Sequence, residues 1–350
     1  MKRTRRIGIV GRIDLSGNLC DGQTVKTRTV YRMLCERYGE ERVVSVDTLN
    51  YRREPIRVLA EFAACLLLAE DIVVLLSRSG RRFLFPALFV STKVLHRRIY
   101  HNLIGSGLPR DVRQRPALRR YLNSFARNWV ESPSIVQELE KLGVDGVEYL
   151  PNFKQIVSAD LGESYHRTSP VRFCTFSRVN NAKGVGTAVR AISEINSRNR
   201  GPSLTLDIYG PIDEDYRQEF VSLTRDVDCV AYKGVVSPED GVGVLKAYAA
   251  LLFPTEHPQE GMPGSIIDAL YAGLPVLSAR WPYYSDMLTD GKTGYSYPQG
   301  DPSGLERTIV EFLKASDAEI YAIRRECLRR SERYSAPVAF GTMVKEIEQQ

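Results

Sequence analysis

The sequence has few features of a metal centre or of a disulfide-stabilised fold. Its 350 residues contain six cysteines, none of which forms a C-x-x-C pair or shows the spacing of zinc ligands. Isolated cysteines usually behave as small buried hydrophobic residues, which fits a reducing cytosol. No D-x-D motif is placed in a metal-binding loop, because the acidic run 213–215 follows Gly210–Pro211 and is expected to cap a helix. We therefore expect no metal site and no cofactor. The cysteines are Cys20, Cys35, Cys65, Cys174, Cys229 and Cys327.

Long hydrophobic segments are also absent. Only I-G-I-V-G follows the basic N-terminus, which is too short for the apolar core of a signal peptide. The most apolar stretch is 58–76. Because Glu61, Glu70 and Asp71 interrupt it, this stretch predicts a buried helix followed by a strand rather than a membrane span. With 43% hydrophobic and 26% charged residues, the composition is ordinary for a soluble globular protein, and we expect a cytoplasmic one.

Charge is distributed unevenly along the chain. Residues 1–150 carry 26 Lys and Arg against 16 Asp and Glu, a net charge of +10, whereas the remainder carries −4 of the overall +6. Twelve basic residues and a single acidic one, Asp111, lie within 78–127. This asymmetry favours an anionic partner, and we predict peripheral contact of 78–127 with an anionic membrane or a lipid phosphate. A solvated basic face without a partner is the alternative. Nucleic acid is not expected, because no nucleic-acid motif is present.

Apolar runs of strand length alternate with segments of helical period throughout the chain. This alternation predicts an α/β protein with two doubly wound, Rossmann-like parallel sheets. The first half predicts strands at 7–11, 42–47, 71–76, 97–101, 128–131 and 147–152, with helices at 24–38, 56–70, 83–92, 115–125 and 133–142. The second half predicts strands at 171–177, 204–210, 229–234, 249–254 and 275–279, with helices at 185–198, 216–224, 238–247, 264–272, from 300 onward and at 317–331.

The length of the chain predicts two domains. We assign one to residues 1–150 and one to residues 151–333, followed by an amphipathic segment at 334–350. Ligands of open α/β sheets bind beyond the carboxyl ends of the strands. We therefore expect the two sheets to face each other across a central cleft that holds the site.

The segment E-G-M-P-G-S-I-I-D from Glu260 to Asp268 places two carboxylates eight residues apart at the entrance of a predicted helix. That spacing is about two helical turns, so both acids can project toward one side. Free N–H groups after Gly261 and the positive end of the helix dipole suit phosphates. Together with the acids they suit a sugar nucleotide. The alternative is that both acids are solvated surface residues.

A second candidate motif, S-R-V-N-N-A-K-G, occupies residues 177–184 directly after a predicted strand. Arg178 and Lys183 would lie at the carboxyl end of that strand, where they can neutralise a diphosphate. Gly184 would open the next helix. An exposed loop with two basic residues is the alternative interpretation.

Two further motifs belong to the first half. D-G-Q-T-V-K-T-R (21–28) follows the first strand, where Gly22 allows a close approach and Thr24 could cap the helix. In Y-H-N-L-I-G-S-G-L-P (100–109), His101 ends a strand that faces the expected cleft. A simple turn and a structural histidine are the respective alternatives.

These motifs resemble the donor site of glycosyltransferase family 4, which has the GT-B fold. The resemblance rests on the E-x7-E pattern followed by A-x-x-x-G-x-P-V (269–276) and on S-R-x-x-x-x-K-G, and it is most specific over 177–294. Here Asp268 replaces the second Glu, which puts the ribose geometry in question. Members of this fold often return their last helix to the first domain, which 334–350 is suited to do.

The resemblance implies a role for each candidate residue. Glu260 would bind hydroxyls of the transferred sugar, and Asp268 would accept from the ribose. His101 would touch the donor sugar. The catalytic residues are therefore expected to be His101, Arg178, Lys183 and Glu260. Donor binding is expected from Gly22, Arg178, Lys183, Gly210, Gly234, Glu260, Gly261, Met262, Pro263, Gly264, Ser265 and Asp268.

The expected activity is that of a retaining hexosyltransferase. It would move a sugar from a nucleotide-sugar, with UDP-sugar favoured and GDP-sugar open, to a glycan or lipid-linked saccharide during polysaccharide biosynthesis. Retention is implied to occur by same-face attack without a metal, at the inner face of the plasma membrane. The alternatives are a GT-B sugar-nucleotide epimerase and a non-catalytic sugar-nucleotide or polyanion-binding protein.

Overall fold

The computed structural model describes residues 6–17, 19, 21–198 and 203–349, and it divides the chain into two compact units. Unit 1 comprises Met1–Gln155 and Ser335–Gln350, and unit 2 comprises Ile156–Tyr334. Each unit contains one six-stranded sheet in which all neighbouring strands run parallel. The units therefore have the same architecture, and each presents the carboxyl ends of its strands along one edge of its sheet.

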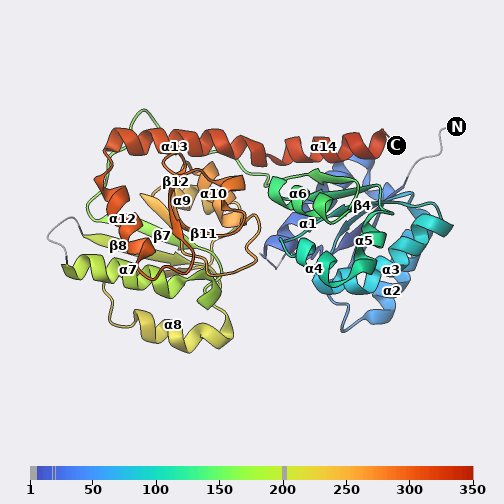
Figure 1. Cartoon of the computed structure of the whole chain (residues 1–350), viewed down its shortest axis with the longest axis horizontal. Helices are drawn as coiled ribbons and strands as arrows, with labels where there is room; N and C mark the ends of the chain where they lie inside the picture. The colour runs from blue at the N-terminus through green and yellow to red at the C-terminus, as the bar shows by residue number, and fades with distance from the viewer. Residues whose placement is uncertain (1–5, 18, 20, 199–202, 350) are drawn as a thin grey trace. The chain divides into compact units, whose positions relative to one another are not determined.

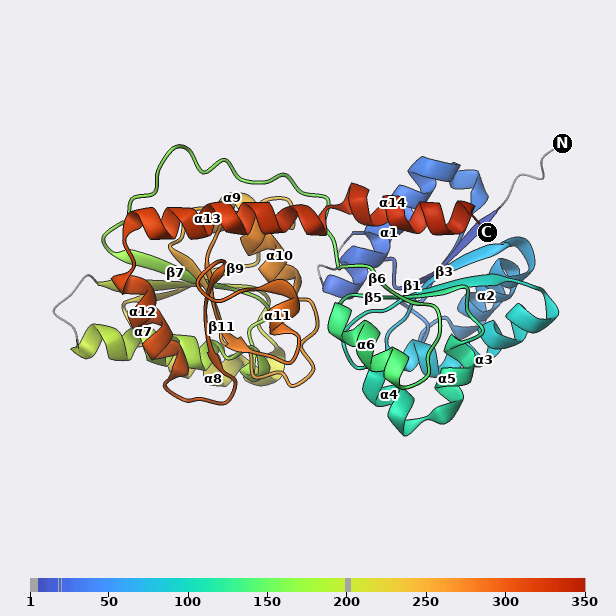
Figure 2. The same cartoon turned by 45° about the horizontal axis from the view of Figure 1, so that its top comes forward.

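The sheet of unit 1 has the strand order β2-β1-β3-β4-β5-β6. Helices α1 and α14 lie on one face of it and α3, α4 and α5 on the other (Figure 2). Its strands are β1 (Ile7–Gly11), β2 (Val43–Asp47), β3 (Asp71–Leu75), β4 (Arg98–Asn102), β5 (Arg127–Val130) and β6 (Val147–Tyr149). Its helices are α1 (Gly22–Tyr38), α2 (Pro55–Leu68), α3 (Arg78–Val94), α4 (Leu108–Gln114), α5 (Pro116–Leu122), α6 (Pro133–Lys141) and α14 (Ala336–Glu348).

The sheet of unit 2 has the strand order β12-β11-β10-β7-β8-β9. Helices α9, α10 and α13 lie on one face of it and α7, α8 and α12 on the other (Figure 1). Its strands are β7 (Val171–Phe176), β8 (Leu204–Tyr209), β9 (Val230–Gly234), β10 (Ala250–Phe253), β11 (Val276–Arg280) and β12 (Gly294–Pro298). Its helices are α7 (Val185–Arg198), α8 (Arg217–Thr224), α9 (Gly241–Leu245), α10 (Gly264–Tyr271), α11 (Tyr284–Met287), α12 (Gly304–Lys314) and α13 (Asp317–Ser331).

The central strands explain why both sheets are covered on both faces. All residues of β1, β3 and β10 are buried, and apart from Asp71 at the start of β3 they form continuous apolar runs instead of alternating patterns. Such runs are stable only when helices pack on both sides of the sheet. The prediction of two doubly wound parallel sheets is therefore confirmed.

The C-terminal helix α14 belongs to the core of unit 1. Phe340 and Met343 of α14 join a cluster that contains Met33 and Leu34 of α1 together with Trp129 of β5. Residues more than 300 positions apart in the sequence thus share one hydrophobic core. Burial of this apolar face, not helix propensity, stabilises α14.

Several predicted elements differ from those observed. Helix α4 (Leu108–Gln114) was not predicted; Pro109 lies in its first turn, where a proline is tolerated. The helix predicted from residue 300 begins at Gly304 instead. Strand β12 (Gly294–Pro298) was also not predicted, because it starts at a glycine with φ 141°. A Cβ on Gly294 would lie 1.9 Å from the carbonyl oxygen of Val276, so this edge pairing requires glycine.

The five described cysteines are free thiols, and three of them, Cys65, Cys174 and Cys327, are buried. Cys20 lies outside the described residues. Among the described helices, none is both long enough and apolar enough to span a membrane.

Replacing Met343 by alanine should destabilise unit 1 by about 2–5 kcal/mol, because the fully buried side chain would leave a cavity in the core. Val338→Ala on the same helix is the matched control, since Val338 is 62% exposed and its loss should cost less than about 0.5 kcal/mol. Urea unfolding followed by Trp129 fluorescence in a Trp281→Phe background would report unit 1 alone. Equal unfolding midpoints for the two variants would show that α14 is not part of this core.

Candidate functional site

The loop after β7 contains the S-R-V-N-N-A-K-G motif and is held in one conformation by its own residues. The Asn180 side chain accepts a hydrogen bond from the Lys183 N–H at 3.0 Å and caps the short turn Asn181–Lys183. Gly184 ends this turn in the left-handed region, with φ 68°. A Cβ on Gly184 would lie 1.9 Å from the carbonyl oxygen of Pro254. Glycine is therefore required for the close approach of this loop to the loop after β10.

Lys183 and Glu260, two of the predicted site residues, form an ion pair. The Lys183 Nζ lies 2.5 Å from the Glu260 Oε2, and the side chains are 21% and 11% exposed. The hydroxyl of Thr255 donates to the same Glu260 oxygen at 3.0 Å. The Phe253 ring lies 5.5 Å from the Lys183 Nζ. A cation suited to phosphate and an acid suited to sugar hydroxyls thus meet at the carboxyl edge of the sheet of unit 2.

Arg178 is also paired. Its partner is Asp213, an acid that we expected to cap a helix. The Arg178 guanidinium donates to the Asp213 carboxylate at 2.9 Å, and the Asn180 amide donates to the other oxygen at 2.8 Å. Burial disfavours the ionised form of Asp213, but the hydrogen bonds from Asn180 and Arg178 outweigh burial and lower its pKa. Asp213 occupies the N-cap position of the short 3-10 helix Glu214–Tyr216, as expected of the acidic run 213–215, but its side chain makes no capping bond. Asp213 instead orients Arg178.

Gly210 has a structural reason for being glycine. Its φ is 131°, and a Cβ there would lie 1.9 Å from the carbonyl oxygen of Ser177. The end of β8 therefore approaches the first residue of the loop that contains Arg178. Gly234 ends β9 with φ 80° and has open space around its Cα. The predicted donor contacts of both glycines remain predictions.

The segment between Glu260 and α10 is fixed by a buried tryptophan. The indole N–H of Trp281 donates to the carbonyl oxygen of Gly261 at 3.0 Å. Met262 is buried, and Pro263 precedes the first residue of α10. Helix α10 starts at Gly264, and no side chain of the described residues caps its first turn. Its first N–H groups and the positive end of its dipole are suited to an anion.

Ser265 and Asp268 lie within α10. Ser265 belongs to its first turn, as predicted from the sequence. Asp268 is only 5% exposed, so it is not a solvated surface acid. Its predicted contact with a ribose stays a prediction.

His101 lies in the interior of unit 1, not at an exposed edge. It is fully buried on β4, its ring packs edge-on against Phe85 at 5.1 Å, and neither ring nitrogen makes a hydrogen bond of standard geometry. Burial, reinforced by the charge of Arg81 and opposed by the Asn128 amide, lowers the pKa of His101 to about 3. The expectation that His101 faces an open cleft is therefore corrected. Its predicted role in catalysis is untested.

The D-G-Q-T-V-K-T-R motif forms the start of α1, with a different cap from the one expected. Asp21 is the N-cap residue and accepts from the N–H and the hydroxyl of Thr24, at 3.2 and 2.8 Å. Thr24 therefore lies inside the helix. A Cβ on Gly22 would meet no atom within 4 Å, so the structure imposes no glycine there. Lys26 from the same motif forms a buried ion pair with Glu131 at 2.8 Å.

Sequence reasoning missed four residues that position the site of unit 2. They are Asp213, Phe253, Thr255 and Trp281, and each contacts a predicted site residue or its backbone. Thr255 directly follows a predicted strand. Because ligands of open α/β sheets bind at the carboxyl ends of the strands, this position could have identified Thr255 as a candidate site residue. In the described ranges, no three His, Cys, Asp or Glu side chains are grouped closely enough to hold a metal ion.

His101 should remain neutral in the folded protein when the pH falls from 7 to about 4. The unfolded chain binds a proton near the ordinary value of 6.5 and the folded chain only near 3, so stability should decrease as the pH falls through this window. An NMR titration of the imidazole would measure the first effect. His101→Gln should flatten the loss of stability between about pH 6.5 and 4, and a midpoint near 6.5 in the folded protein would contradict the burial argument.

Comparisons with known proteins match this region. Residues 170–315 match the family model described as glycosyl transferases group 1. Over 158 residues the chain is 22% identical to the amylovoran biosynthesis glycosyltransferase AmsK of Erwinia amylovora, covering 44% of this chain and 38% of AmsK. The chain thus matches about two fifths of the length of this curated relative. The predicted resemblance to this group is confirmed.

Solved structures similar to this chain cover nearly all of it. The structure of HepE from Anabaena in complex with UDP has a TM-score of 0.74 at 13% identity and covers 99% of this chain and 100% of that one. Sucrose-phosphate synthase from Thermosynechococcus elongatus has a TM-score of 0.74 at 14% identity and covers 99% of each chain. At such low identity these similarities establish the fold alone. Residues 170–315 therefore resemble the group 1 glycosyl transferases, and the two parallel-sheet units of the chain match the GT-B fold of these solved structures.

Proposed function

We propose that this protein transfers a sugar from a nucleotide-sugar, with UDP-sugar favoured, to a glycan or lipid-linked saccharide. The observation that carries the proposal is the Lys183–Glu260 ion pair at the carboxyl edge of the sheet of unit 2, inside the family-matched region. It combines the two chemistries that a nucleotide-sugar needs, a cation for phosphate and a carboxylate for hydroxyls. The description of HepE as a complex with UDP and that of AmsK as a biosynthetic glycosyltransferase agree with this proposal.

The proposed chemistry depends on stabilising the departing diphosphate. Arg178, Lys183 and the uncapped start of α10 supply positive charge where the phosphates would bind. In the structure Lys183 is paired with Glu260 and Arg178 with Asp213. Phosphate binding would therefore exchange a carboxylate partner for a phosphate partner, and no metal is required in this proposal. Retention by same-face attack is carried over from the family resemblance.

The remaining donor contacts follow from the same placement. Glu260 is held by Thr255 and would be released toward the sugar hydroxyls when the phosphates engage Lys183. The backbone of 261–263, fixed by Trp281, would approach the sugar and phosphates. Asp268 would accept from the ribose, and His101 would contact the donor sugar only if the side chains over it move.

The proposed acceptor and location follow from the charge of unit 1. A lipid-linked saccharide presents phosphate at a membrane surface, and residues 78–127 carry twelve basic residues with one acid. We therefore propose a cytoplasmic enzyme of polysaccharide biosynthesis that contacts the inner face of the plasma membrane peripherally.

Arg178→Ala and Lys183→Ala should each lower turnover by roughly 100-fold or more, because each removes positive charge from the departing diphosphate. The assay is release of nucleotide from a panel of UDP-, GDP- and dTDP-sugars, with and without saccharide acceptors. Lys314→Ala is the matched control, since this exposed lysine lies at the end of α12 and has no carboxylate partner in the described residues. Its activity should equal that of the wild type.

The same panel separates the proposal from its rivals. An epimerase would convert the donor without releasing nucleotide to an acceptor. A silent binding protein would bind UDP in calorimetry and release none from a donor. Full activity of both the Arg178 and the Lys183 variant would contradict the phosphate assignment.

A further inference from the structure

Exposed apolar side chains concentrate on two neighbouring helices of unit 1. Of the sixteen large hydrophobic residues that are exposed in the described chain, seven lie on α2 and α3. They are Ile56, Leu59, Leu67, Leu68, Phe83, Val90 and Val94, and their exposed fractions range from 49% to 82%. Such a concentration on helices that together make up a small part of the chain indicates a surface with a partner.

Helix α3 carries two separate apolar stripes. Phe85 and Leu88 are fully buried against the rest of unit 1. Phe83, Val90 and Val94 are 70%, 54% and 67% exposed. Because successive helical residues turn by about 100°, these three fall on a single outward stripe. A helix that buries one apolar face and presents another is unusual for a solvated surface.

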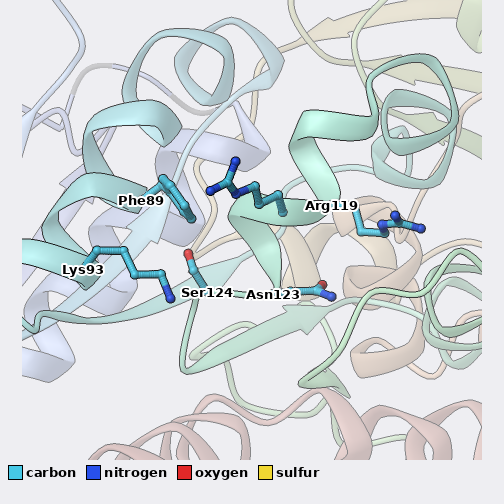
Figure 3. A pocket seen from close by; sticks show the side chains of 6 residues that line it. Phe89, Lys93, Arg119, Asn123 and Ser124 are labelled. Atoms are coloured by element: carbon cyan, nitrogen blue, oxygen red, sulfur yellow. The ribbon is translucent and has the colours of Figure 1, made fainter.

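A basic groove runs beside this outward stripe, between α3 and α5. It contains a pocket of about 510 Å³, in which Phe89 and Lys93 project from α3 and lie across from Arg119, Asn123 and Ser124 (Figure 3). A second pocket of about 290 Å³ in the same groove is lined by Arg78, Arg81, Arg82, Pro86, Asp111, Arg115, Ala117, Leu118 and Tyr121. The groove is therefore lined by cations and aromatic rings along its length.

Five of the seven cations that line this groove have no carboxylate partner among the described residues. Asp111 is the one acid that lines the two pockets, and it is already paired with Arg78 at 2.8 Å and with Arg81 at 3.2 Å. Across the described residues, no carboxylate pairs with Arg82, Lys93, Arg115, Arg119 or Arg120. Lys93 and Arg120 instead lie over the Phe89 ring, at 5.9 and 5.1 Å. Their charge remains available to an anion.

We propose that the α3–α5 surface docks on an anionic lipid bilayer. The groove would receive the phosphates of lipid headgroups, while Phe83, Val90 and Val94 enter the boundary with the acyl chains. An outward apolar stripe flanked by cations is the pattern of a helix that lies in the membrane interface. A nucleic acid would use the cations and leave the apolar stripe in water, so the bilayer fits both features. The inference refines the membrane contact proposed above and names the residues that make it.

Co-sedimentation with vesicles tests the docking surface. Wild-type protein should bind phosphatidylcholine vesicles that contain phosphatidylglycerol, bind pure phosphatidylcholine weakly, and lose affinity as salt rises. Arg119→Gln with Arg120→Gln should weaken binding by roughly 10- to 30-fold, since each basic residue near an anionic surface contributes a few-fold or more. Phe83→Ser with Val90→Ser should weaken it as well, because the apolar insertion is lost.

Matched controls lie in unit 2. Arg225→Gln with Arg325→Gln removes the same charge from exposed positions, and Val221→Ser with Val235→Ser removes exposed apolar side chains that are 46% and 58% exposed. Both controls should bind vesicles like the wild type. Melting curves of all variants exclude loss of folding as the cause.

Three results would overturn the inference. The groove variant could bind as tightly as its control, the apolar variant could bind like the wild type, or inorganic phosphate at low millimolar concentration could displace the protein from the vesicles. The second result would show that the apolar stripe does not enter the bilayer, and the third would assign the groove to a free anion. Release of nucleotide by the wild type without vesicles is measured separately, so failure of the transfer proposal and failure of the docking proposal can be told apart.

Discussion

The candidate site depends on the contact between two loops of unit 2, and the Lys183–Glu260 ion pair is the interaction that joins them. The pair is mostly shielded from water, where an unpaired charge would be costly. Its geometry requires the close approach that Gly184 permits and the hydroxyl of Thr255 as a second donor to Glu260. A ligand with phosphates and hydroxyls could satisfy both partners at once, which is why the proposed donor site is placed at this pair.

In unit 1, the buried cations Lys26 and Arg81 are paired with carboxylates, whereas most cations on the α3–α5 surface are not. In the interior, Lys26 is matched by Glu131 and Arg81 by Asp111. On the α3–α5 surface, Arg119 and Arg120 face no carboxylate of the described chain. Cations without a carboxylate partner and exposed apolar side chains thus occur together on this surface, and the proposed docking on a bilayer rests on that combination.

Much of the fold could be predicted because buried parallel strands are apolar runs of characteristic length, as in β1 and β3. Strand β12 could not be predicted, because it depends on Gly294 passing over the backbone of Val276. The resemblance and the amphipathic pattern of 334–350 predicted a last helix that returns to the first domain, and α14 does pack in the core of unit 1. Which residues α14 contacts could not be predicted, because the other members of this core lie between Ile7 and Phe153.

The candidate site, like the fold, could be predicted only in part. The sequence spacing led to Lys183 and Glu260 as partners in one site, and the structure brings them together. The sequence did not reveal that Asp213 orients Arg178, or that His101 is buried, because both depend on the packing of neighbouring strands.

A crystal structure of the full chain with bound UDP is the most direct test of the central claim. We expect the diphosphate within hydrogen-bond distance of Lys183 and Arg178, with Lys183 drawn away from Glu260. A nucleotide bound elsewhere, with the Lys183–Glu260 pair intact, would contradict it.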